Sequence, residues 1–137
     1  MKENYVGAVV RRSAQIFLVQ NLPDWGVPFP SYSWTAPWAK REPWEHVHAS
    51  AIWALASFCF KGEIEHQSVF TYRRVPTDGH ELVVEFVEAR PSDDWHPYLE
   101  HHRNAVGAGW FPYDVARKLP LNDATRDCLT WLSQNGF

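Results

Sequence analysis

Two small groups of residues in this chain have side chains that could transfer protons or bind a metal. The first is Glu42 with Glu45, which lie three positions apart beside the start of an expected helix. The second is Glu100-His101-His102, a dense run of potential ligands in a polar stretch. Carboxylates and imidazoles do such chemistry when the fold makes them converge on one point. Glu42, Glu45 and Glu100 are therefore catalytic candidates, beside the simpler interpretation that both groups are exposed polar surface.

Arginines and tryptophans offer a second kind of chemistry, the recognition of phosphates and flat rings. Two arginine pairs, Arg11-Arg12 and Arg73-Arg74, fall on or beside expected strands, where a guanidinium can pair with a substrate phosphate. Trp34, Trp38 and Trp44 lie close together along the chain, and an indole can stack on a nucleobase or bury itself against a protein. Surface arginines and core tryptophans are the competing interpretation. Eight tryptophans in 137 residues are many to bury in one core, so we expect one or more to line a pocket or an interface.

Length and composition are typical of one globular domain, which we expect to span residues 1–137. The 45% hydrophobic and 21% charged residues indicate a packed core. A net charge of −3 gives no electrostatic footprint for nucleic acid or for an anionic membrane. No apolar run reaches the ~18–20 residues that cross a bilayer, and none forms a signal peptide, so we expect a cytoplasmic protein. Cys59 and Cys128 predict small buried thiols within helices rather than a disulfide framework.

Strand and helix patterns alternate along the chain and predict an α/β fold. One hairpin is expected from strands at residues 5–10 and 15–20, and a second from strands at residues 63–75 and 81–89. The other expected elements are a loop at 21–30, a short strand at 34–36, an irregular segment at 91–107, a short strand or turn at 109–112, a small helix at 113–118 and a final helix at 123–134 capped by Asn122.

The central helix is expected over residues 44–60. Pro43 suits the first helical turn, and Gly62 suits the position after the last one. The apolar stripe expected to face the core consists of Trp44, Val47, Ala51, Leu55 and Phe58. No Asp or Glu occurs between Glu45 and Glu63, so this helix offers no carboxylate with which to hold a catalytic metal.

This order of elements resembles the Nudix family of hydrolases, which act on nucleoside-diphosphate-linked compounds. The resemblance covers nearly the whole chain and implies an α/β/α sandwich with a mixed sheet. Four segments carry it, namely Gly7-Ala8-Val9-Val10-Arg11-Arg12, Trp34-Thr35-Ala36-Pro37, Lys40-Arg41-Glu42-Pro43-Trp44-Glu45 with the alanine-rich helix after it, and Gly109-Trp110-Phe111-Pro112-Tyr113-Asp114 with Leu119-Pro120-Leu121.

The family signature is G-x5-E-x7-R-E-U-x-E-E-x-G-U, where U is a bulky aliphatic residue. Its glutamates share one face of a helix and converge on divalent metal, usually magnesium. The metal polarises the diphosphate and activates water for attack on phosphorus. An arginine of the signature pairs with a glutamate and holds this face in shape.

Only Glu45 and Leu55 match this signature when Glu45 is aligned with its first glutamate. The remaining glutamate positions are occupied by Ala54, Ser57 and Phe58, and no other register supplies a carboxylate. The other mismatched positions are Ala39, Trp53, Phe60 and Lys61. The resemblance therefore implies a retained scaffold with a degenerate Nudix box, and we expect neither a metal nor a cofactor.

The leading hypothesis is a catalytically inactive protein that binds a partner protein or a phosphorylated, nucleotide-type ligand through the former active-site cleft. The residues expected to line that cleft are Arg11, Arg73, Trp34, Trp38, Trp44, Ala54, Ser57 and Phe58. The alternative is a Mg²⁺-dependent hydrolase of nucleoside diphosphate compounds with relocated groups at Glu42, Glu45 and residues 100–102. RNA binding is a third hypothesis, which the absence of a basic run argues against. The sequence leaves the ligand, the partner and a homodimeric state open.

Overall fold

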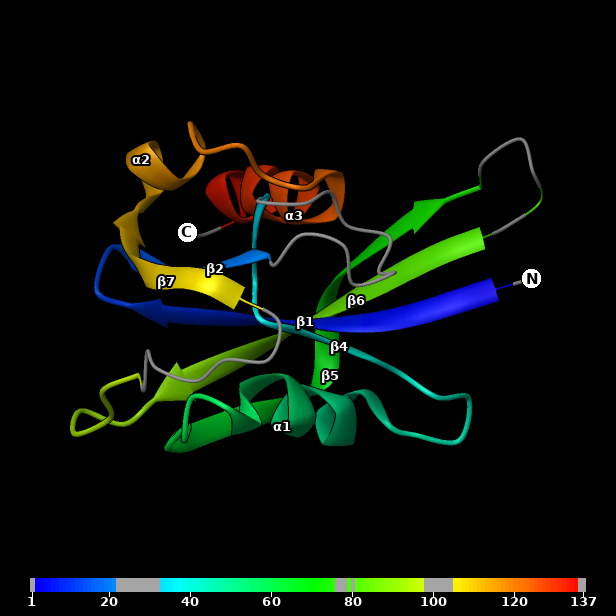
Figure 1. The fold of residues 1–137 in the computed structure, drawn as a ribbon, viewed down its shortest axis with the longest axis horizontal. Helices are drawn as coiled ribbons and strands as arrows, with labels where there is room; N and C mark the ends of the chain where they lie inside the picture. The colour runs from blue at the N-terminus through cyan, green and yellow to red at the C-terminus, as the bar shows by residue number, and fades with distance from the viewer. Residues whose placement is uncertain (1, 22–32, 76–78, 80, 98–104, 136–137) are drawn as a thin grey trace.

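A computed structural model describes residues 2–21, 33–75, 79, 81–97 and 105–135 (Figure 1). The strands join into one mixed sheet in the order β3-β2-β1-β6-β5, with β4 paired to β1 and β7 paired to β2. The elements are β1 (Lys2–Arg12), β2 (Gln15–Asn21), β3 (Trp34–Thr35), β4 (Trp38–Lys40), α1 (Val47–Ala56), β5 (Gly62–Arg74), β6 (Glu81–Pro91), β7 (Ala105–Pro112), α2 (Tyr113–Ala116) and α3 (Asp123–Gln134).

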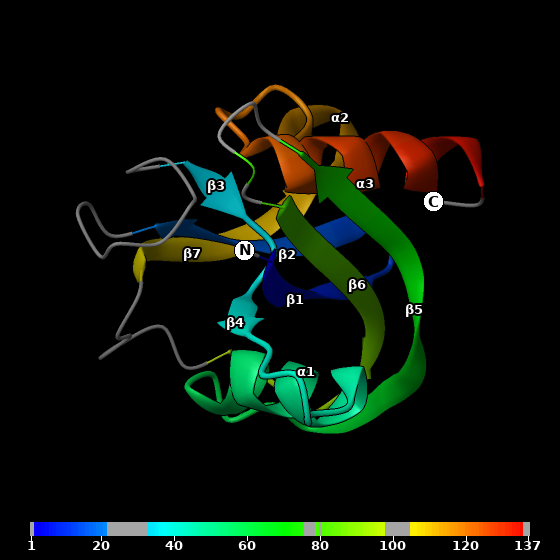
Figure 2. The ribbon, with the colours of Figure 1, turned by 90° about the vertical axis from the view of Figure 1, so that its right-hand side faces the viewer.

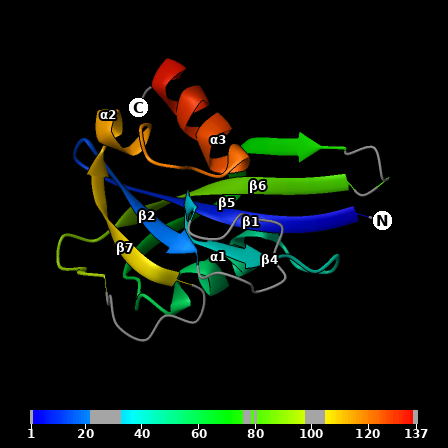
Figure 3. The ribbon, with the colours of Figure 1, turned by 45° about the horizontal axis from the view of Figure 1, so that its top comes forward.

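Strand β1 holds the sheet together because it pairs on both sides. It runs parallel to β6 over nine residue pairs, from Lys2 opposite Glu81 to Val10 opposite Ala89. It is antiparallel to β4 near its start and to β2 at its end. Figure 3 shows the two halves of the sheet at an angle to each other, joined at the turn between β1 and β2. Both predicted hairpins, β1–β2 and β5–β6, are confirmed.

Helices cover both faces of the sheet, with α1 on one side and α3 on the other (Figure 2). The alternation of side chains along β1 divides the core accordingly. Tyr5 and Val9 pack in the cluster that contains the buried residues of α3. Val6, Ala8 and Val10 pack in the clusters that contain the buried residues of α1. The predicted α/β/α sandwich with a mixed sheet is therefore confirmed.

Close packing explains the glycine in the opening strand. A Cβ atom on Gly7 would lie 2.7 Å from the ring of Phe86, which is nearer than real Cβ contacts allow. The Phe86 ring is fully buried and occupies the space that a side chain at position 7 would need. Gly7 thus lets a large ring pack against the middle of the sheet.

The central helix differs from the prediction at both ends. It begins at Val47, where the side chain of His46 accepts a hydrogen bond from the His48 backbone N–H, and it ends at Ala56 rather than at residue 60. Trp44 therefore precedes the helix and is 80% exposed, so the prediction that it belongs to the apolar stripe facing the core was wrong. The prediction that Cys59 is a buried thiol within the helix was also wrong, because Cys59 is exposed and lies in the turn after the helix with φ 52°. Cys128 is buried as predicted.

Strand β4 was not predicted, and strand β7 is longer than predicted. The prediction missed β4, which forms when residues after Pro37 pair with the start of β1. Strand β7 begins at Ala105, inside the segment predicted to be irregular, because it finds its partner in β2. The predicted N-cap is confirmed, since the side chain of Asn122 accepts a 2.8 Å hydrogen bond from the Thr125 N–H. None of the helices in the described ranges has the length and apolar character that a membrane span requires.

Candidate functional site

Ala54, Ser57 and Phe58, the residues that the sequence comparison with the family signature aligned with its glutamates, do not share one open face. Ala54 and Phe58 are buried, with 6% and 4% of their surfaces exposed, whereas Ser57 is exposed. The helix ends at Ala56, and the N–H groups of Phe58 and Cys59 donate to carbonyls three residues back. This tighter turn moves Ser57 toward solvent and Phe58 toward the sheet.

Phe58 belongs to a group of five rings that we call the aromatic cluster. Its members are Phe17, Phe58, Phe60, Trp95 and Trp110. The ring of Phe17 lies 5.1 Å from Phe58, 5.8 Å from Trp95 and 5.4 Å from Trp110, measured between centroids. Trp95 is fully buried, and its indole N–H donates a 3.1 Å hydrogen bond to the Phe58 carbonyl. The space beside the end of α1 is thus filled by the chain's own side chains.

Arg12 closes one side of the aromatic cluster. Its Nη2 atom donates 2.8 Å hydrogen bonds to the carbonyls of Ser92 and Trp95. Its guanidinium also lies 5.1 Å from the centre of the Trp110 ring, within the range of a cation–π interaction. The guanidinium therefore fixes the segment after β6 in place. The sequence offered Arg12, with Arg11, as a possible phosphate contact, and it did not indicate these contacts with backbone carbonyls and an indole.

Glu42 and Glu45 meet at the loop before α1, where Arg41 organises the backbone. The Arg41 Nε donates to the Glu45 carbonyl at 2.9 Å, and its Nη1 lies 2.7 Å from a carboxylate oxygen of Glu85 on β6. The Glu45 carboxylate accepts from the Glu42 N–H at 3.3 Å and from the Ser50 hydroxyl at 3.4 Å. Glu45 is therefore engaged in shaping the entry to the helix.

The structure separates the arginines and tryptophans that the sequence grouped together. Arg11 contacts both carboxylate oxygens of Glu88 at 2.9 Å, and Arg73 lies 3.0 Å from Glu81. Trp34 and Trp38 are half-buried against the core on the α3 side, whereas Trp44 is exposed near α1. These side chains do not line one common cleft with Ala54, Ser57 and Phe58. Their predicted contacts with a ligand stay predictions.

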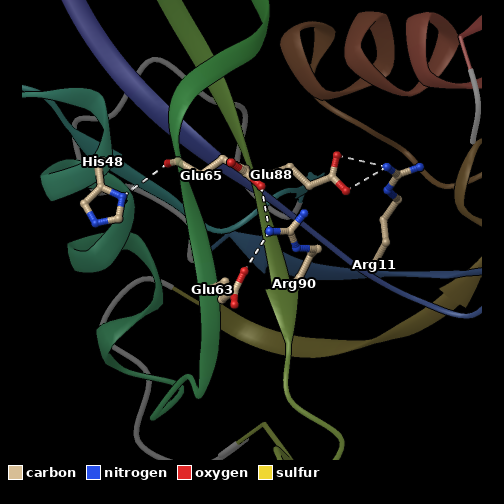
Figure 4. A network of polar contacts seen from close by, with 6 residues as sticks. All are labelled: Arg11, His48, Glu63, Glu65, Glu88 and Arg90. Atoms are coloured by element: carbon tan, nitrogen blue, oxygen red, sulfur yellow. Dashed lines mark hydrogen bonds and ion pairs between the residues drawn. The ribbon is translucent and has the colours of Figure 1, made fainter.

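A charged network crosses the sheet between the ends of β1, β6 and β5 (Figure 4). Arg90 lies 2.7 Å from Glu63 and 2.9 Å from Glu65, and these contacts hold its pKa above the ordinary arginine value. Arg90 also lines an open hollow of about 510 Å³. The other residues that line this hollow are Glu65, His66, Gln67, Ser68, Val69 and Glu88. Each carboxylate of the network is paired with an arginine, so the hollow presents no bare metal site.

His48 ties α1 to this hollow. Its ring stacks on His66 with centroids 4.0 Å apart and planes 13° apart. Its Nδ1 lies 3.2 Å from the Glu65 carbonyl, as Figure 4 shows, so a proton on Nδ1 would be donated to this oxygen. Among the described residues, no group of three His, Cys, Asp or Glu side chains could hold a metal ion. The candidates Glu100, His101 and His102 lie outside the described residues.

The outer face of α1 is the feature that the sequence analysis missed. Its exposed positions are Ala49, Ile52, Trp53 and Ala56, with Trp53 72% and Ile52 48% exposed. The helix contains no Asp, Glu, Lys or Arg, so it has no charged face. The absence of carboxylates was noted in the sequence, but the absence of any charged residue was the more general signal.

The fold has many counterparts among solved structures. A MutT NUDIX hydrolase from Burkholderia pseudomallei superimposes with a TM-score of 0.76 at 20% identity over 95% of this chain and 97% of that one. The ORF135 protein of E. coli gives 0.74 at 18% identity over 98% and 91%. The NUDIX domain of Shewanella oneidensis NrtR, solved with ADP ribose, gives 0.74 at 17% over 98% and 88%.

At such low identities the similarity establishes the fold and nothing finer. The chain has the Nudix hydrolase fold, as its resemblance implied. No protein-family model and no curated protein matches the sequence itself.

Proposed function

We propose that this chain is a Nudix-fold protein with a degenerate box, which does not hydrolyse diphosphates and acts by binding a partner protein. The observation that carries this proposal is the environment of Phe58. A residue that the family uses to hold magnesium is here a buried ring, packed against Phe17 and hydrogen-bonded through its carbonyl to Trp95. Ala54, Ser57 and Phe58 do not fit a magnesium ion, which requires several oxygen ligands in octahedral geometry.

The same packing favours a protein over a small molecule as the binding partner. The aromatic cluster fills the space beside the end of α1, while Trp53 and Ile52 on the outer side of the helix face solvent. Exposed aromatic residues grouped with other apolar residues are typical of protein interfaces. In this proposal the helix that carries catalysis in the resembled family serves as a binding surface.

The proposal is tested by measuring nucleoside monophosphate release from a panel of nucleoside-diphosphate-linked compounds, with Mg²⁺ or Mn²⁺ and with a chelator. We expect equal, background rates in all three conditions. Metal-dependent hydrolysis that disappears in the Glu42→Ala/Glu45→Ala double variant would support the alternative, a hydrolase with relocated groups. Metal-dependent hydrolysis that survives this double variant would also refute the proposal and direct attention to residues 100–102.

A nucleotide-type ligand is the second candidate. It is supported by the NrtR NUDIX domain, which shares this fold and was solved with ADP ribose. Equilibrium dialysis of this chain against labelled ADP ribose separates the two candidates. Saturable binding without turnover would favour a nucleotide-binding protein over a protein-binding one.

A further inference from the structure

The exposed residues of helix α1 are all apolar, although that side of the helix does not contact the domain. Its inner face buries Val47, Ser50, Ala51, Ala54 and Leu55 against the sheet. Its outer face presents only apolar side chains, namely Ala49, Ile52, Trp53 and Ala56, which we call the α1 outer face. A helix at the surface of a globular domain ordinarily carries polar residues on its outer side, so an apolar outer side indicates a surface that another molecule covers. We infer that the α1 outer face is the interface through which two copies of this chain form a homodimer. This inference rests on the proposed function, because it names the partner that the binding surface takes.

The shape of the α1 outer face allows it to pack against the same face of a second chain. Ala49 and Ala56 lie seven residues apart, two helical turns along one stripe, with Ile52 and Trp53 between them. In a two-fold symmetric interface each large residue of one copy meets a residue of the other, and the reverse contact is made at the same time. In an antiparallel pair centred on this stripe, Ile52 of one copy meets Trp53 of the other, and Ala49 meets Ala56. The alanines on both sides of this apolar centre permit the helices to approach closely.

Electrostatics also favours a second copy on this face. The α1 outer face carries no charge, so pairing it with itself brings no like charges together, although each chain has a net charge of −3. The dipoles of two antiparallel helices attract each other at both ends. The exposed tryptophans are the residue type that most often dominates binding energy at the centre of an interface.

The exposed area is large enough to form the centre of such an interface. A tryptophan buries about 150–250 Å² when it is covered. At exposures of 72% for Trp53 and 80% for Trp44, which lies three residues before α1, the two indoles offer roughly 300 Å² per chain. A standard interface buries about 800 Å² per partner. Trp53, Ile52 and the alanines thus provide the apolar centre, Trp44 adds exposed apolar surface before the start of the helix, and the neighbouring surface provides the rim.

The test is the mass of the full chain in solution, measured by light scattering and sedimentation over a dilution series. We expect the wild-type protein to approach twice the chain mass of 15.9 kDa as concentration rises. Trp53→Glu and Ile52→Glu should each weaken association by about 30-fold or more, because each places a charge in the apolar centre. Trp53→Phe, which keeps an apolar ring, should retain most of the association.

Val75→Glu is the matched control. Val75 is 71% exposed but lies at the end of β5, away from α1, so the same change of charge should leave the dimer intact. A wild-type chain that stays monomeric at every concentration would overturn the inference and leave a different protein as the partner. So would a Trp53→Glu variant that remains dimeric, or a Val75→Glu variant that dissociates equally. Circular dichroism of each variant confirms that it is folded.

The assay of nucleoside monophosphate release, made on the same preparations, separates this inference from the proposed function. A monomer without hydrolysis contradicts only the dimer. A dimer with metal-dependent hydrolysis contradicts only the non-hydrolytic function.

Discussion

Introducing a carboxylate at position 58 should destabilise this protein rather than activate it. When the family signature is aligned on Glu45, position 58 corresponds to one of its glutamates, so Phe58→Glu is the substitution that would add a ligand if a metal site were present. Here the position is 4% exposed within the aromatic cluster. We therefore expect Phe58→Glu to be strongly destabilising.

The expected loss of unfolding free energy has two parts, the loss of the buried ring and the burial of a carboxyl group. Removing a buried phenylalanine ring destabilises by about 3–5 kcal/mol. Placing a carboxyl group in the same apolar space adds about 1–3 kcal/mol, even when its pKa rises and it becomes neutral. The total of about 4–8 kcal/mol is comparable with the whole stability of a typical domain, about 5–15 kcal/mol. At about 3–4 °C per kcal/mol for a chain of this length, the Tm should fall by about 15–30 °C or the protein should not fold.

The assay is thermal and urea unfolding of Phe58→Glu beside two matched variants. Ser57→Glu introduces the neighbouring family glutamate at an exposed position, so it should change stability by less than about 0.5 kcal/mol. Phe58→Leu keeps an apolar side chain and should destabilise by about 1–2 kcal/mol. A Phe58→Glu variant with wild-type stability, or one that Mg²⁺ stabilises, would refute the packing described for this end of α1.

Three other results follow from the described contacts. Arg41→Ala should lower the unfolding free energy by about 1–2 kcal/mol, because it leaves the half-buried Glu85 without its 2.7 Å partner; additive effects in a double-mutant cycle with Glu85→Gln would contradict this coupling. A thiol reagent should modify the exposed Cys59 in the folded protein but reach Cys128, whose pKa burial raises to about 12, only on unfolding. Burial also raises the pKa of Tyr5 to about 12, so the folded state holds protons that the unfolded state releases, and urea midpoints should fall as pH rises from 9.0 toward 12; constant midpoints over this range would contradict the burial of both groups.

The sequence predicted the parts of the fold that local patterns determine. The two hairpins, the central helix and the capped final helix each have a period or a capping residue that marks them. Strands β4 and β7 pair with strands that are distant in the sequence. The local sequence therefore does not predict β4 or the start of β7 at Ala105. Topology, rather than propensity, decides such pairings.

The site was predictable only in part, for a similar reason. The sequence showed that carboxylates were absent from the central helix, and the structure shows what stands there in their place. Helical spacing placed Trp44 in the core stripe and Phe58 in a row with Ala54 and Ser57. Both expectations assumed a longer helix, and the ends at His46 and Ser57 depend on individual hydrogen bonds that spacing does not reveal. Trp95 closes the aromatic cluster from a segment far along the chain, which no local pattern could indicate.

The central claim is that the helix which binds metal in the resembled family binds none here. Isothermal titration calorimetry of the full chain with Mg²⁺ and with Mn²⁺ tests it most directly. The account predicts no saturable heat for either ion, and no difference between the wild-type protein and the Glu42→Ala/Glu45→Ala variant. Stoichiometric, saturable binding that this double variant abolishes would contradict it.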